Sequence, residues 1–122
     1  VASAHAVLDI IADEKLCERS AALGARLVDA LNAAQAKQPR IVEVRGVGAM
    51  VAVEFNTPDG KPDADFTKLV QQRALEAGLL LLSCGVYGNV IRFLFPLTIE
   101  DSVFAEGLAA FEEKRRPQWG KP

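Results

Sequence analysis

The sequence predicts an α+β fold, a two-layer domain in which helices pack on one face of a small, mostly antiparallel sheet. Four segments place apolar residues at the spacing of amphipathic helices, and four shorter segments are rich in Val, Ile, Leu and Phe between glycines and prolines. Their order is α-α-β-β-α-β-β-α, which suits helices on one side of a sheet. The 122 residues, half of them hydrophobic, are enough for a single domain with its own core.

Two helices are expected at the start of the chain. The first, over residues 1–12, has apolar side chains at helical spacing: Val7, Ile10 and Ile11. The second extends from Leu16 to near Lys37, and its leucines form one stripe: Leu16, Leu23, Leu27 and Leu31. Pro39 limits this helix, because the residue before a proline disfavours helical backbone.

Two strands joined by a tight turn are expected next. In IVEVRGVGAMVAVEF, β-branched residues alternate over 41–45 and again over 49–55. Gly46 and Gly48 supply the permissive backbone that a turn between these strands requires. Residues 56–63 are rich in Pro, Asp and Gly and are expected to form a loop.

A third helix is expected after this loop. Asp63 or Asp65 can cap its N-terminus, and Gly78 suits the left-handed position after its last turn. The spacing predicts one buried face: Phe66, Leu69, Val70, Arg73, Ala74 and Ala77.

The last part of the chain predicts two strands and a helix. The strands are expected over 79–83 and 90–95, with the glycine-containing loop 84–89 between them. Thr98 is expected to cap the final helix, whose buried face is predicted to hold Val103, Phe104, Leu108 and Phe111. Residues 115–122 are interpreted as a solvated tail.

Composition and charge argue against several classes of protein. The net charge is −2 and the Lys and Arg residues are scattered, which disfavours a nucleic-acid surface. No apolar run approaches the roughly 18 residues that span a membrane, and no signal peptide is visible. Cys17, Cys84 and the single His5 do not form a zinc or disulfide framework, so two free thiols in a reducing, cytoplasmic location are expected.

Arg92 is the residue that calls for a chemical explanation. It lies in the apolar strand VIRFLF, where alternation separates it from the side chains expected to pack on the helices, Ile91, Phe93 and Phe95. Burying an unpaired guanidinium costs roughly several kcal/mol, so an anion must meet Arg92 if its face is covered. The residues alone leave two partners open, an internal acid of the fold or the carboxylate of a ligand, which arginine binds through two parallel hydrogen bonds.

Three segments of the chain together resemble one family. AHAVLDII, VRGVGAMVAVEF and RALEAGLLLLSCGVYGNVIRFLFPLTI are similar to the C-terminal small domain of the pyridoxal-phosphate-dependent class III aminotransferases, and most similar to the bacterial 4-aminobutyrate type. The resemblance extends from Val1 to about Glu113. It implies that residues 1–122 are the small domain of a larger enzyme whose cofactor-binding domain lies outside this sequence. The absent initial Met and the uncapped first helix lead to the same expectation.

The resemblance also implies a reaction and a role for Arg92. The family transfers an amino group from an ω-amino acid, here 4-aminobutyrate, to 2-oxoglutarate, giving succinate semialdehyde and glutamate. Its cofactor, pyridoxal 5′-phosphate, is bound through a lysine. The arginine of the VIRFLFPL motif, Arg92 in this chain, is the family's clamp for the α-carboxylate of glutamate or 2-oxoglutarate. Other expected partners are the chain's own large domain and further copies in a homodimer or higher homo-oligomer, with no nucleic acid, membrane or metal.

No catalytic or cofactor-binding residue is expected in this chain. None of its lysines stands in the family's lysine motif, so the chain alone is expected to be inactive and to lack bound cofactor: Lys15, Lys37, Lys61, Lys68, Lys114 and Lys121. Other conspicuous residues are interpreted as structural or have no assigned role: Arg45, Gly46 and Gly48 in the hairpin, His5 on a packed or interface face, and Cys84, Tyr87 and Trp119.

Two alternatives stay open from the sequence. One is a freestanding regulatory or oligomerisation module that binds a small amino acid. The other is a different ω-aminotransferase of the same family, acting on ornithine, acetylornithine or β-alanine. The residues that distinguish the members of the family are expected in the large domain.

Overall fold

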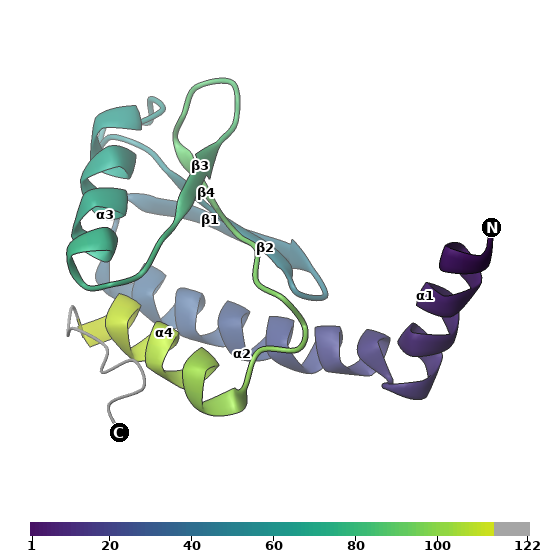
Figure 1. The fold of residues 1–122 in the computed structure, drawn as a ribbon. Coiled ribbons are helices and arrows are strands. Elements are labelled where there is room, and N and C mark those ends of the chain that lie inside the picture. Colours follow the sequence, from purple (N-terminus) through teal and green to yellow (C-terminus); the bar gives the residue numbers. More distant parts are fainter. Residues whose placement is uncertain (114–122) are drawn as a thin grey trace.

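The computed structural model describes residues 1–113 and confirms the predicted element order (Figure 1). Its four helices and four strands are α1 (Ala2–Asp13), α2 (Leu16–Lys37), β1 (Ile41–Val47), β2 (Met50–Phe55), α3 (Ala64–Glu76), β3 (Leu82–Cys84), β4 (Val90–Phe93) and α4 (Asp101–Glu113). The strands form one sheet in the order β1-β2-β4-β3, and each neighbouring pair is antiparallel. The two expectations on residues 115–122, the solvated tail and Trp119, lie outside the described residues.

Three of the helices cover one face of the sheet, and the core lies between the two layers. α2 crosses beneath β1 and β2 with α4 alongside it, while α3 packs against β2, β3 and β4 (Figure 1). The most deeply buried apolar side chains come from both layers, as two-layer packing requires: Leu23, Leu31, Val51, Val53, Phe55 and Ile91.

The first helix does not join this packing. α1 lies beyond the N-terminal end of α2, at an angle to it and away from the sheet (Figure 1), and it has no buried residue. Val7, Leu8 and Ile10 are exposed to 54%, 62% and 48%, so an apolar helix stays without a cover among the described residues. The prediction that helices pack on the sheet therefore holds for α2, α3 and α4.

The segment that enters β3 is less regular than predicted. The expected strand over 79–83 is replaced by a strand over Leu82–Cys84, because the backbones of Leu79 and Leu81 form hydrogen bonds with residues of α3 instead. The Leu79 amide donates to the carbonyl of Ala74 at 2.8 Å, and the Gln71 side chain donates to the carbonyl of Leu81 at 3.0 Å. Gly78 has the predicted left-handed backbone, with φ of 85°.

The start of α4 also differs from the prediction. Thr98 lies in a turn and does not cap the helix, which begins at Asp101, and the Phe104 amide donates to the carbonyl of Glu100 at 2.9 Å. β4 likewise ends at Phe93, two residues earlier than expected. The stretch between them is held by Arg19 of α2, a long-range contact that local spacing does not reveal.

Two buried helical faces are partly different from the predicted ones. Leu69 and Val103 are 47% and 38% exposed, and Arg73 is also exposed. Thr67 takes the inward position on α3 instead, fully buried, because its hydroxyl donates to the carbonyl of Asp63 at 2.8 Å. A short polar side chain that bonds to the helix backbone can be buried without an unsatisfied group.

A close approach of backbone to backbone fixes the β1–β2 hairpin on α2. A Cβ atom on Gly24 of α2 would lie 1.8 Å from the carbonyl oxygen of Gly48, so only glycine fits there. Gly48 has a φ of 55°, as a tight turn requires, and the Ala49 amide donates to the Ser20 hydroxyl at 2.9 Å. Helix α2 therefore holds the hairpin in place from its turn.

Asp63 caps α3, and replacing it is expected to destabilise the domain. Its carboxylate accepts from the Phe66 amide at 2.9 Å and pairs with Arg40 at 2.6 Å while almost completely buried. Asp63→Ala removes the cap and the ion pair, so we expect the free energy of unfolding to fall by about 2 kcal/mol. Chemical denaturation monitored by circular dichroism measures it. Asp65→Ala, at the exposed alternative cap, is the control and is expected to change it by a few tenths of a kcal/mol, roughly; equal losses would contradict the assignment.

Candidate functional site

The candidate site is the face of the sheet that α2, α3 and α4 leave uncovered, called the open face here. Arg92 lies in the middle of β4, directly opposite Ala52 of β2 on one side and Leu82 of β3 on the other. Arg45 of β1 is the next residue in the same row, opposite Ala52. Because paired residues of antiparallel strands point to the same side, these four side chains form one row across the open face.

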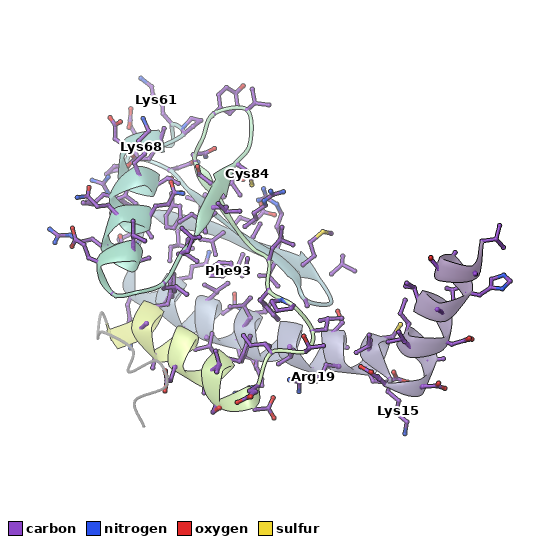
Figure 2. All side chains as sticks on the ribbon, viewed as in Figure 1. Lys15, Arg19, Lys61, Lys68, Cys84 and Phe93 are labelled. Carbon is purple, nitrogen blue, oxygen red and sulfur yellow. The ribbon has the colours of Figure 1, made fainter. Side chains whose placement is uncertain are left out.

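The alternation predicted for the VIRFLF segment is confirmed at Arg92. Ile91 and Phe93 are buried against the helices, with 0% and 9% exposure, while Arg92 between them is exposed. Phe93 points into the space between the sheet and the helices (Figure 2), and its ring meets Phe111 edge-on at 5.8 Å. The apolar neighbours of Arg92 in the chain therefore belong to the core behind it.

Among the carboxylates of residues 1–111, none lies within 4.0 Å of the Arg92 guanidinium, and no hydrogen bond from it is found within this range. The other arginines in the described part differ: Arg19, Arg40, Arg45 and Arg73 each have a carboxylate at 2.6 to 3.1 Å, and Arg26 lies 4.0 Å from Asp101. An internal acid as the partner of Arg92 finds no support in this part of the chain. The guanidinium keeps its hydrogen-bond donors available on an exposed face.

Acidic side chains lie on the open face, but another arginine binds them. A single nitrogen of Arg45, Nη1, lies 2.8 Å from both Glu43 Oε2 and Glu54 Oε2. The hydrogen bond to Glu54 is the largest factor that raises the pKa of Arg45 above its ordinary value, and burial opposes it only in part. Arg45 was expected only to shape the hairpin, and the structure shows that it also forms ion pairs with two acids, Glu43 and Glu54.

Two residues that the sequence did not single out hold β4 in position. Asn89, just before the strand, is buried, and its side chain donates to the carbonyl of Phe55 at 3.0 Å and to the side chain of Asn56 at 3.2 Å. After the strand, Arg19 donates to the carbonyls of Leu97 and Ile99 at 3.0 and 2.5 Å. Their contacts join positions 33 to 80 residues apart, so no local pattern indicated them.

Cys84 and Leu82 share the open face with Arg92. Cys84 is opposite Val90 and partly buried, one pair of residues along from the Leu82–Arg92 pair. Tyr87 and Val86 lie at the tip of the β3–β4 hairpin, 69% and 96% exposed. Cys17 and Cys84 are both free thiols, and His5 on α1 is exposed.

The residues present do not fit the cofactor of an aminotransferase. A Schiff-base lysine needs a sheltered pocket, but the lysines of the described part are all exposed: Lys15, Lys37, Lys61 and Lys68. Figure 2 shows Lys61 and Lys68 together at one end of the molecule, near the start of α3, and Lys15 at the opposite end. No step of cofactor chemistry is therefore assigned to these residues.

Two hollows of the domain lie on its helical side. A cavity of about 300 Å³ between α2, α3 and α4 is lined mainly by apolar side chains such as Phe55, Phe66 and Phe111. Among the side chains that the structure describes within residues 1–113, no group of three His, Cys, Asp or Glu is placed to hold a metal ion. No helix in the same range is long and apolar enough to cross a membrane. The open face itself is a surface that needs a second surface to become a cleft.

Comparisons with known proteins point to one family. Residues 1–114 match the family described as aminotransferase class-III. The chain is 49% identical over 113 residues to the 5-aminovalerate aminotransferase of Pseudomonas putida, covering 92% of this chain and 27% of that protein. It is 48% identical over 104 residues to the 4-aminobutyrate aminotransferase of Escherichia coli, covering 84% of this chain and 24% of that protein. The chain thus spans about a quarter of the length of these curated relatives.

Solved structures agree with this match. The acetylornithine aminotransferase of Elizabethkingia anophelis superposes with a TM-score of 0.74 at 30% identity, over 91% of this chain and 28% of that one. The ornithine aminotransferase of Toxoplasma gondii superposes with a TM-score of 0.74 at 32% identity, over 88% of this chain and 24% of that one. The fold seen in residues 1–113 is therefore a part of these larger chains.

Proposed function

Because the chain belongs to the class-III aminotransferase family, we propose that it is the substrate-binding small domain of a pyridoxal-phosphate-dependent transaminase. In this proposal, the full-length enzyme transfers an amino group from 4-aminobutyrate to 2-oxoglutarate and forms succinate semialdehyde and glutamate. Arg92 binds the α-carboxylate of glutamate or 2-oxoglutarate. The large domain supplies the lysine and the cofactor site, and the enzyme works as a homodimer or higher homo-oligomer.

The observation that carries the proposal is the free guanidinium of Arg92 on the open face. Its row neighbours Ala52 and Leu82 offer only apolar side chains, so neither competes for the donors of the guanidinium. When a second domain covers this face, water is excluded and a hydrogen bond to a charged carboxylate becomes stronger. A carboxylate that arrives from outside the chain then satisfies a group that otherwise stays unpaired.

The chemistry assigned to this chain is binding and orientation. Arginine presents two parallel N–H donors, which fix a carboxylate in both position and plane. Holding the α-carboxylate in this way places the adjacent carbon of the substrate, where the amino group is exchanged, at a defined distance from the strand. Pyridoxal phosphate acts as the electron sink of transamination when it is bound. Positioning of this kind accounts for a large part of the rate of many enzymes.

The choice of amino donor rests on the two curated relatives. One acts, by its name, on 4-aminobutyrate and the other on 5-aminovalerate. Both compounds are linear ω-amino acids and differ by one methylene. A methylene in an apolar pocket separates substrates by about 1–3 kcal/mol, which is a modest discrimination. We propose 4-aminobutyrate as the donor and a linear ω-amino acid as its class.

An assay of the full-length enzyme tests this function. With 2-oxoglutarate as acceptor, glutamate is expected from 4-aminobutyrate with a kcat/KM at least about tenfold above that for ornithine, a difference of about 1.4 kcal/mol. 5-Aminovalerate is the matched comparison for donor length, and detection of succinate semialdehyde identifies the product. If neither linear donor yields glutamate, the proposed function is wrong. If the enzyme prefers ornithine, the proposed donor class is wrong.

A further inference from the structure

We propose that Arg45 is a positioning residue for Arg92. Arg45 on β1 binds the carboxylate of Glu54 on β2, and so keeps Arg92 on β4 free for the substrate. This inference rests on the proposed function, because it concerns the competition for the same guanidinium. It assigns a role to a residue whose sequence context indicated only the shape of a hairpin.

The first step is that Arg45 binds two acids, Glu43 and Glu54. Glu43 and Glu54 are direct partners in the β1–β2 register, and like charges placed directly opposite each other destabilise a sheet. Arg45 Nη1 lies between them, 2.8 Å from an oxygen of each. The cation next to the two acids binds both of them, and an arginine stays charged at any physiological pH.

The second step is the place of Glu54 relative to Arg92. Glu54 is opposite Val90 and Arg92 is opposite Ala52, so Glu54 and Arg92 occupy diagonal positions on neighbouring strands of the same face. Such diagonal Cβ atoms lie about 7–8 Å apart, within the reach of two long side chains. In the structure, Glu54 turns to Arg45 instead, and its side chain is only 29% exposed.

The third step separates Glu54 from Glu43. Glu43 lies on β1, and the whole width of β2 stands between it and β4. Strands are about 4.8 Å apart, so Glu43 is one strand spacing farther from Arg92 than Glu54 is. Both acids contribute equally to the local repulsion, yet only Glu54 is a near competitor for Arg92. This difference supplies a matched pair of variants.

Freed from Arg45, Glu54 is expected to pair with Arg92. A carboxylate tethered beside the guanidinium has a high effective concentration, so a dissolved substrate must displace it before binding. The cost appears in binding of the substrate carboxylate and not in the steps after binding. The expected signature is therefore a raised KM with a nearly unchanged kcat.

Kinetics of full-length variants test the inference. Arg45→Gln is expected to raise the KM for 2-oxoglutarate about tenfold, on the scale of a competing charged hydrogen bond, with kcat changed less than about twofold. Adding Glu54→Gln to this variant is expected to restore KM. Adding Glu43→Gln is expected to leave KM raised, although it relieves the same like-charge repulsion. Thermal melting of each variant checks that it is folded. Arg45→Met is a second variant, with an uncharged, apolar side chain in place of the guanidinium.

The outcomes separate the two proposals. If Glu43→Gln restores KM as well as Glu54→Gln does, Arg45 only relieves repulsion in the hairpin and the inference is wrong. An unchanged KM in both Arg45→Gln and Arg45→Met also contradicts it. If these variants behave normally while Arg92→Gln loses activity, the proposed function survives and the inference fails. If Arg92→Gln has no effect, both fail.

Discussion

Replacing Arg92 with Gln in the full-length enzyme is expected to lower kcat/KM for 2-oxoglutarate and for glutamate by roughly 10- to 100-fold. The variant loses a hydrogen-bonded charge pair, worth about 1.5–3 kcal/mol, and cannot form the two parallel bonds of a guanidinium. Arg92→Lys is expected to restore only part of the loss, because an ammonium group lacks the planar pair of donors. Steady-state kinetics with varied 2-oxoglutarate measures the effect.

The two halves of the reaction provide an internal control. Glutamate carries a carboxylate on the carbon that bears the amino group, whereas 4-aminobutyrate does not. If Arg92 binds that carboxylate, the half-reaction with glutamate is expected to suffer more than the half-reaction with 4-aminobutyrate. Arg73→Gln is the matched control on α3, since Arg73 is 70% exposed and pairs with Glu76 on the helical side. Equal losses in Arg92→Gln and Arg73→Gln would contradict a specific role.

Gly24→Ala is expected to lower the free energy of unfolding by about 3 kcal/mol, although alanine is the better helix former. The new Cβ would lie 1.8 Å from the Gly48 oxygen and 2.4 Å from the Gly48 carbonyl carbon. Both atoms are backbone of the β1–β2 turn, so the helix or the hairpin must move. Denaturant unfolding of the chain, followed by circular dichroism, measures the loss.

Gly107→Ala in α4 is the matched control for this prediction. It is also a helical glycine, but a Cβ there would meet only the Leu79 Cδ1 atom at 3.9 Å, an ordinary contact. This substitution is expected to stabilise the domain by about 0.5–1 kcal/mol through helix propensity. The two glycine substitutions therefore differ in sign. A stabilising Gly24→Ala would show that α2 and the hairpin are not in close contact.

Features with a short period were predictable from the sequence. The direction of Arg92 followed from the two-residue period of a strand, because Ile91 and Phe93 are apolar and must face the helices. The leucine stripe of α2 followed from the helical period, and Leu23, Leu27 and Leu31 are buried as expected. Local chemistry narrowed the cap of α3 to two aspartates, of which the structure uses Asp63.

Features that depend on distant residues were not predictable in this way. Thr98 has the chemistry of a cap, but Arg19, about 80 residues away along the chain, binds the neighbouring carbonyls and the helix begins later. Glu54 and Arg45 are nine residues apart, and their contact depends on the register of the hairpin. The row that joins Arg45, Ala52 and Arg92 exists only once three strands are paired.

The most direct measurement is a crystal structure of the full-length protein with 2-oxoglutarate bound. We expect two oxygens of its α-carboxylate about 2.7–2.9 Å from two nitrogens of the Arg92 guanidinium, as in a bidentate charge pair. Arg45 is expected to stay on Glu43 and Glu54 in the same crystal. A ligand whose carboxylates bind elsewhere, with Arg92 in solvent or paired to a fixed acid of the protein, would contradict the account.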